Sequence, residues 1–208
     1  MREFITLFLF LSTFSLNCSS ETMEDLVFRD GLFYKKFTNV PFNGDIEGLE
    51  NGAFKDGQRD GHWISYHENG QLSHEGKYRD GKAHGVHQGY NQNGNLVFKA
   101  NYGNGGLDYF EISYFDTGEI KMQETVKNGH FEGLMESFHA PNQLHYRLHW
   151  RQGEAHGEAL EYYLNGQLKS EGIYKNGQRV GRWVFHYKDG TIDQKQTGLY
   201  VNDKKSSD

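Results

Sequence analysis

The chain repeats itself every 24 residues, and this period constrains its fold more than any single residue does. The units begin at Gly61, Gly85, Tyr109, Gly133, Gly157 and Gly181. Self-similarity at a fixed period is typical of repeat architectures, in which each unit buries its apolar side only against its neighbours. The period therefore predicts an extended molecule that acts through a surface and not through a deep pocket.

Each unit combines two short strand-like runs with two turn signals. In the first unit Tyr66 precedes the turn Asn69-Gly70, and Leu72 and Tyr78 precede the turn Asp80-Gly81. Asn, Asp and Gly tolerate the positive φ that a hairpin turn needs, so each unit reads as a pair of antiparallel strands. The predicted fold is all-β, an elongated single antiparallel β-meander built from 24-residue hairpins.

The register of the hairpin follows from the length of its turns. A three-residue loop that ends at a left-handed Gly70 would place Tyr66 directly opposite Leu72. The same loop at the second turn would gather Tyr66, Tyr78 and Ile64 on one buried face. Glycines at position sixteen of several units, such as Gly76 and Gly172, would then leave room for a ring across the strand pair.

The other face of this predicted sheet carries the candidate binding residues. Positions three, five and seven of the units would point away from the core, and they include Trp63, His67, Phe115, Tyr163, Trp183 and Tyr187. Rings beside charged residues on a long sheet are typical of surfaces that recognise a peptide, a protein or a sugar. The alternative is that these rings pack against one another or against the ends of the sheet.

The first residues differ from the repeats. An apolar stretch from Phe4 to Phe14 has the length of a signal-peptide core, and Cys18, the single cysteine of the chain, follows it. This arrangement resembles the lipobox of bacterial lipoproteins, although Ser15 and Asn17 stand where Leu and Gly or Ala are usual. We expect export and a membrane anchor through acylated Cys18, and the alternative is a free cysteine after an ordinary signal peptide.

The chain divides into a linear series of segments. The predicted organisation is a signal peptide over residues 1–17, an acidic tether over 18–26, an N-terminal variant repeat as a cap over 27–60, five repeats over 61–180, a C-terminal variant repeat as a cap over 181–203 and a tail over 204–208. Atypical end units shield the edges of a repeat sheet from pairing with other strands.

The repeat also resembles a known family. The pattern G-x-W-x-x-Y-x-x-N-G-x-L-x-x-E-G-x-Y-x-N-G over residues 61 to 181 is similar to the MORN-repeat variant of bacterial proteins, often labelled YwqK-type antitoxins. The leading segment LVFRDGLFYKKFTNVPFNGDIEG is similar to the segment that precedes the repeats in such proteins. The unit at Tyr109 lacks the leading glycine, and FHAPNQL replaces the Asn-Gly turn of the fourth unit, so we expect irregularity there.

The net charge, the histidine spacing and the lack of catalytic motifs restrict the classes of function that we expect. The net charge is -6 with no basic stripe, which argues against a nucleic-acid partner. The nearest histidine pairs are His145 with His149 and His84 with His87, and the first pair would lie roughly 13 Å apart along a strand, too far for one metal ion. Nothing resembles a nucleophile elbow or a catalytic carboxylate pair, so we expect no enzyme, metal or cofactor.

These observations predict a non-enzymatic protein of the cell envelope that binds another protein through its aromatic sheet face. One alternative is an immunity or antitoxin role, in which the resemblance implies a toxin as the partner. The other alternative is a module that binds cell-wall glycan.

Overall fold

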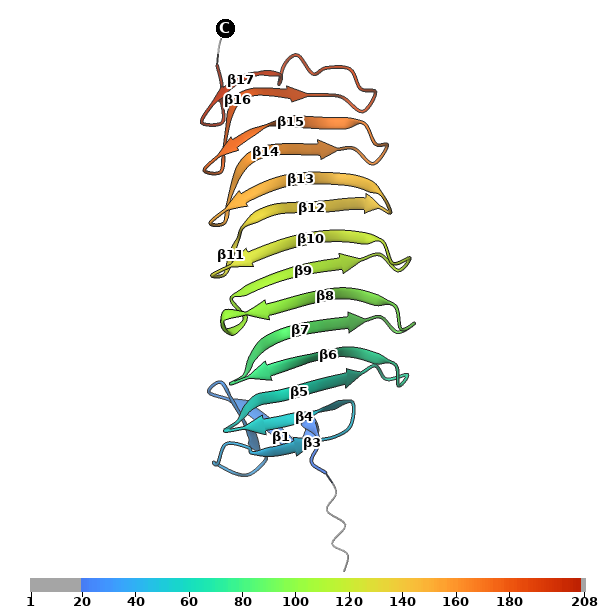
Figure 1. Ribbon diagram of the computed structural model, residues 1–208, viewed down its shortest axis with the longest axis vertical. Coiled ribbons are helices and arrows are strands. Elements are labelled where there is room, and N and C mark those ends of the chain that lie inside the picture. Colours follow the sequence, from blue (N-terminus) through green and yellow to red (C-terminus); the bar gives the residue numbers. More distant parts are fainter. Residues whose placement is uncertain (1–19, 207–208) are drawn as a thin grey trace, which may run out of the picture.

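The protein is a long, curved ladder of antiparallel strands. The computed structural model describes residues 20–206, and in Figure 1 the chain climbs strand by strand from one end of the sheet to the other. Sixteen strands form this sheet, and β1 and β2 form a separate two-stranded hairpin at the N-terminal end. The predicted all-β meander is confirmed, with this additional hairpin beside it.

The strands have the following bounds, in chain order: β1 (Leu26–Arg29), β2 (Leu32–Lys35), β3 (Gly44–Ile46), β4 (Glu50–Lys55), β5 (Gln58–Tyr66), β6 (Leu72–Arg79), β7 (Lys82–Tyr90), β8 (Leu96–Gly103), β9 (Asp108–Tyr114), β10 (Ile120–Lys127), β11 (His130–Phe131), β12 (Gly133–Ala140), β13 (Gln143–Arg151), β14 (Glu154–Tyr162), β15 (Leu168–Lys175), β16 (Gln178–Phe185), β17 (Gly198–Val201) and β18 (Lys204–Lys205). Short 3-10 turns occupy Met23–Asp25 and Asn104–Gly106. Strand β11 pairs with β10 beside the main path of the sheet.

The first turn of the unit has the predicted geometry. The backbone N–H of His67 donates to the carbonyl of Gln71 at 2.8 Å, which closes a three-residue loop. Gly70 at the end of this loop has φ +81°, a conformation that glycine adopts without steric cost. Tyr66 lies opposite Leu72, as the sequence predicts.

The second turn is shorter than predicted. Arg79 pairs with Lys82, so the loop holds only Asp80 and Gly81, whose φ values of 48° and 74° are those of a type I′ turn. The same pair of positive φ values recurs at Asp30-Gly31, Asp56-Gly57, Asn128-Gly129, Gln152-Gly153 and Asn176-Gly177. A two-residue loop matches the right-handed twist of the strands it joins, which explains its repetition.

The second strand of the hairpin, β6, contains a β-bulge that the sequence pattern does not predict. Ser65 pairs with His74 whereas Tyr66 pairs with Leu72, so Ser73 is an extra residue in β6. On the side of the bulge away from the Asn69-Gly70 turn, Trp63 lies opposite Gly76. The prediction that Tyr78, Ile64 and Tyr66 share one buried face is therefore wrong.

Tyr78 lies on the face of Trp63 instead. Their ring centroids are 6.2 Å apart, while Ile64 pairs with Glu75 on the reverse side. We call the side that carries Trp63 and Trp183 the tryptophan face, and the side that carries Tyr66, Tyr90 and Tyr162 the tyrosine face.

The leading glycine of the unit makes a second irregularity between neighbouring hairpins. Gly85 has φ +70°, and the pairing of β6 with β7 shifts next to it. The unit that begins with Tyr109 has no such glycine, and the irregularity in strand pairing that we expect there is absent. Strands β8 and β9 pair without a shift, with Tyr102 opposite Tyr109. In the fourth unit the pairing of β12 with β13 shifts twice around Phe138, at the predicted irregular place.

The core of the sheet is a column of rings laid over glycines on the tryptophan face. A Cβ added to Gly52 would lie 2.4 Å from Trp63 Cδ2, so the indole occupies the space that a side chain would need. The indole Nε1 of Trp63 donates to the carbonyl of Ala53 at 3.2 Å. The predicted space above glycine is present, and the ring that fills it comes from the following hairpin.

The N-terminal end is closed by a small apolar cluster. Leu26, Ile46, Phe54 and Trp63 are buried together, with Phe33 and Phe42 packed against them. The β1–β2 hairpin thus covers the first strands of the sheet on the tryptophan face (Figure 1).

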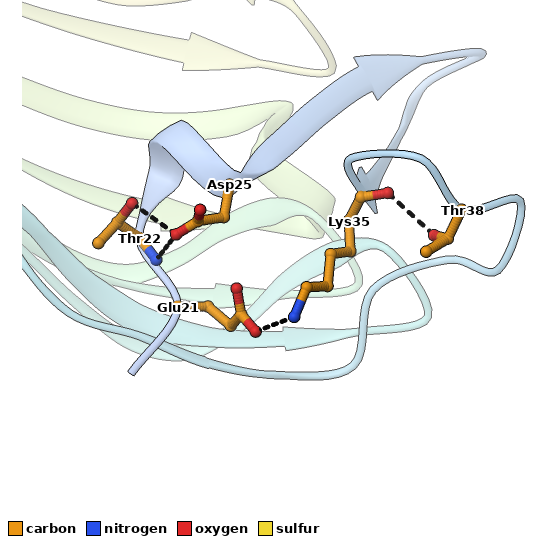
Figure 2. A network of polar contacts seen from close by, with 5 residues as sticks. All are labelled: Glu21, Thr22, Asp25, Lys35 and Thr38. Carbon is orange, nitrogen blue, oxygen red and sulfur yellow. Dashed lines mark hydrogen bonds and ion pairs between the residues drawn. The ribbon is translucent and has the colours of Figure 1, made fainter. Parts of the chain in front are cut away.

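Residues 20–26, predicted as part of a tether, lie against this end. Glu21 forms a parallel bridge with Ile46. Its carboxylate also forms an ion pair with Lys35, as Figure 2 shows. The backbone N–H and the hydroxyl of Thr22 both donate to Asp25 at 2.9 Å, which caps the short 3-10 turn. From Ser20 onward the segment is therefore part of the cap, whereas Cys18 and the predicted signal peptide lie outside the described residues.

The C-terminal end is closed by β17 and β18. Lys204 and Lys205, assigned to the tail, pair with Val201 and Tyr200. Asp203 accepts hydrogen bonds from the backbone N–H and the guanidinium of Arg179 at 3.0 and 3.1 Å. These bonds hold the last hairpin to β16 and lower the pKa of the Asp203 carboxyl.

Candidate interaction surface

The two tryptophans predicted to bind a partner belong to the core. Trp63 and Trp183 are 1% and 2% exposed. Trp183 repeats the arrangement of Trp63, because its ring lies over Gly172 and its Nε1 donates to the carbonyl of Ile173 at 3.1 Å. Their predicted place on an exposed face is wrong, because the Ser73 bulge and the shorter second turn bring the aromatic columns to the tryptophan face.

Two other predicted binding residues hold neighbouring hairpins together. His67 Nε2 lies 2.8 Å from the carbonyl oxygen of Tyr90, and the hydroxyl of Tyr163 donates to the carbonyl of His186 at 2.9 Å. Each contact joins one unit to the next at the turn edge of the sheet. Phe115 is half-buried at the same edge, and Tyr187 is 51% exposed in the last unit.

His87 takes the place of a tryptophan in the second unit. Its ring lies against Gly76, it is 2% exposed, and its Nε2 lies 2.7 Å from the carbonyl oxygen of Lys77. Because a carbonyl oxygen only accepts, Nε2 carries the proton, and Nδ1 is free to accept from His74 Nε2 at 3.2 Å. Burial lowers the pKa of both imidazoles, and for His74 the neighbouring His87 lowers it further.

Two carboxylates face each other in the middle of the tryptophan face. Glu111 on β9 pairs directly with Glu124 on β10, and the hydroxyl of Tyr109 donates to Glu124 Oε1 at 3.3 Å. Burial, and then the charge of Glu124, raise the pKa of Glu111. Burial and the same carboxylate raise the pKa of Tyr109 to about 12. This pair destabilises the sheet when both carboxyls are charged.

The histidines form pairs other than those noted in the sequence. The close pairs are His74 with His87 and His139 with His145, whose ring centroids are 4.0 Å apart. Among residues 20–206 no group of three or more His, Cys, Asp or Glu side chains is placed to hold a metal ion.

An exposed apolar column runs along the tyrosine face. Val86, Phe110 and Leu134 occupy position two of three successive units and are 48%, 45% and 37% exposed. Since each unit contributes two strands, neighbouring members of this column are roughly 10 Å apart. Ile173 extends the apolar surface toward the C-terminal end and is 48% exposed.

A polar cluster lies next to this column. Glu136 on β12 is 9% exposed, and it accepts hydrogen bonds from Arg147 Nε and Gln123 Nε2, both at 2.6 Å. These bonds satisfy the carboxylate and hold β10, β12 and β13 together beside Leu134. The tyrosine face thus presents exposed apolar side chains beside a fixed charged network.

Sequence reasoning missed this column. The signal was available, because position two is apolar in three consecutive units and polar in the flanking ones, as His62, Glu158 and Arg182. The register predicted from the sequence buries the tyrosine face, so it does not identify the column as exposed.

The comparisons agree with the hairpin boundaries. A family model described as the MORN repeat variant matches residues 59–80, 83–104 and 155–176. These matches coincide with the hairpins β5–β6, β7–β8 and β14–β15. A search of curated proteins finds no match. No helix within residues 20–206 is long and apolar enough to cross a membrane. Three hairpins of this sheet thus match the MORN repeat variant, and MORN repeats are in general modules of protein or membrane interaction.

Proposed function

We propose that this chain is a non-enzymatic interaction protein that binds another protein through the apolar column of Val86, Phe110 and Leu134. The observation that supports the proposal is the exposure of these three side chains in line on successive hairpins. Exposed apolar side chains in line on a rigid sheet are typical of protein interfaces, since a partner gains free energy by covering them. The polar cluster around Glu136 would supply directional contacts at the rim.

The location that we propose is the cell envelope, with a lipid anchor at Cys18. The support is the apolar stretch from Phe4 to Phe14 followed by the lone cysteine. Mass spectrometry of the mature protein and detergent partitioning of the Cys18→Ala variant test this part. Identical partitioning of variant and wild type would refute the anchor.

The binding surface is tested by replacing the column. We expect the triple variant Val86→Ser, Phe110→Ser and Leu134→Ser to lose the partner that wild-type protein captures by crosslinking in its own cells. The matched control is Leu164→Ser, since Leu164 is 66% exposed at a turn edge away from the column. Capture of the same partner at equal yield by the triple variant would refute the proposed surface.

The alternative roles call for different partners. Binding of cell-wall glycan would call for exposed rings, whereas Trp63 and Trp183 are buried in the sheet and present little ring surface to a sugar. Neutralisation of a toxin remains a special case of protein binding. It would be recognised if the captured partner were toxic when produced without this chain.

A further inference from the structure

The column of rings on the tryptophan face is interrupted in the third, fourth and fifth units, where position three holds Glu111, Met135 and Ala159. In three other units a ring at position three covers a glycine eleven residues earlier, as Trp63 covers Gly52, His87 covers Gly76 and Trp183 covers Gly172. At the corresponding place in the fifth unit Ala159 pairs with Leu148. Alanine and leucine together fill less space than the glycine and tryptophan of the neighbouring Gly172–Trp183 junction.

The missing ring leaves a cleft of about 220 Å³ above Ala159. Leu148 and Tyr146 lie on one side of it, and Tyr174 and Trp183 lie on the other. Glu161 and Ser170 line its polar end. The walls are themselves fixed, because Trp183 is held over Gly172 and its ring lies 4.8 Å from that of Tyr174, centroid to centroid.

The geometry of the cleft suits an aromatic ring. Where the column is complete, each ring meets a tyrosine edge-on, at 76° for Trp63 with Tyr78 and 77° for His87 with Tyr102. Tyr174 and Trp183 offer the same kind of wall beside Ala159. An inserted ring would therefore find the contacts that the protein's own rings make elsewhere.

The tryptophan face is acidic at the cleft and beyond it. Glu161 lines the cleft, and strand pairing places Glu124 and Glu111 on the same face, roughly 14 and 19 Å from Ala159 at about 4.8 Å per strand. Lys169 is ion-paired to Glu161 at 2.7 Å, which leaves the other two carboxylates without a basic partner among the hydrogen bonds and ion pairs of the described residues. Burial and the neighbouring His139 lower the pKa of His145, so this imidazole at the cleft adds no charge at neutral pH. The face thus favours an occupant with positive charge.

We propose that the cleft above Ala159 binds an aromatic side chain of a partner polypeptide in which a basic residue stands next to the aromatic one. The ring fills the gap in the column above Ala159, and the cation lies toward Glu161 and Glu124. This site is on the opposite face from the apolar column of the proposed function and does not depend on it.

The experiment uses the tripeptide Ac-Lys-Trp-Lys-NH2 as the probe and the intact mature protein in an NMR titration. We expect shifts of the Ala159 amide and the Trp183 indole signals, with nuclear Overhauser contacts between the probe ring and the Ala159 methyl group. Ac-Lys-Ala-Lys-NH2 and Ac-Glu-Trp-Glu-NH2 should bind at least tenfold more weakly. Absence of contacts to Ala159 in the wild-type protein overturns the proposal without need of any variant.

The double variant Leu148→Gly with Ala159→Trp closes the cleft in the manner of the other units. It should lose probe binding at least tenfold, whereas Phe110→Ser on the opposite face should retain it. Unchanged binding by a folded double variant, or binding at this cleft of chitotriose in place of the peptide, would overturn the proposal. Loss of the natural partner by the column variants with retained probe binding would separate this site from the proposed function.

Discussion

Trp183 lies so close over Gly172 that a Cβ on this glycine would come within 2.2 Å of the indole Cδ2. A contact of this length cannot be relieved at a flexible side-chain end, because the atom that it meets belongs to a rigid ring. The Trp183 indole is held by its hydrogen bond to Ile173, so the strand or the ring has to move.

The Gly172→Ala variant should therefore be destabilised by about 1–3 kcal/mol, the usual cost of overpacking a filled site. The measurement is the free energy of unfolding in urea. The matched control is Gly103→Ala, since Gly103 has ordinary φ and no atom within 4 Å of its added Cβ. Equal stability of Gly172→Ala and Gly103→Ala would contradict the ring-over-glycine packing.

Trp63 should behave as a core residue and not as a binding residue. Truncation to alanine removes the ring that covers Gly52 and contacts Phe54 and Tyr78, so the Trp63→Ala variant should lose about 3–5 kcal/mol of stability. Thermal unfolding followed by circular dichroism measures this loss. Tyr187→Ala is the comparison, because that ring is half exposed in the last unit, and its unfolding temperature should be close to that of wild type.

The sequence predicts the fold correctly because local signals repeat in every unit. Turn chemistry and spacing are enough to place Tyr66 opposite Leu72 and to put a ring above the glycines at position sixteen. Which face of the sheet is buried could not be predicted in the same way. Ser73 carries no signature of a bulge, and one extra residue moves every side chain beyond it to the other side of the strand.

The candidate site was misplaced for the same reason. Alternation within β5 correctly separates Trp63 from Tyr66, but only the pairing of Tyr78 shows which of the two faces is packed. The gap at Ala159 cannot be predicted from local sequence, because it depends on four strands lying side by side, β13 to β16.

Removing one charge of the central acidic pair should stabilise the sheet. Glu111→Gln leaves Glu124 with its hydrogen bond from Tyr109 and ends the repulsion between paired strands. We expect a gain of about 0.5 kcal/mol at pH 7, since one cross-strand side-chain pair changes stability by roughly 0.2–1 kcal/mol. The pKa of Glu111 is raised, and a carboxyl with a raised pKa destabilises the fold when it is ionised. The stability gain of Glu111→Gln should therefore be present at neutral pH and decrease as the pH falls. The gain should vanish below about pH 4 in urea unfolding series, and a gain independent of pH would argue against repulsion as its cause.

The buried imidazole pair should make the protein less stable in mild acid. The folded pKa values of His74 and His87 both lie below the ordinary value of 6.5, so the unfolded chain takes up protons first as the pH falls. Their contribution to stability is complete above about pH 6.5 and is lost as the pH falls toward the folded values. Arg59 near His74 opposes protonation and Glu75 favours it, while His87 is enclosed by the uncharged rings of Tyr78 and Tyr102.

The His87→Trp variant tests whether the imidazole pair causes the acid sensitivity. It introduces tryptophan at position three of the second unit, where the first unit has Trp63. Its indole can cover Gly76 and donate to the Lys77 carbonyl as His87 does, and it does not titrate. We expect a smaller decrease in the free energy of unfolding between pH 7 and pH 5 than in wild type, measured by urea unfolding at closely spaced pH values. The control is His84→Gln, since His84 is an exposed histidine on the same strand and its replacement should leave the decrease unchanged. If His87→Trp retains the full decrease, the acid sensitivity arises elsewhere, and the buried pair of His74 and His87 does not govern it.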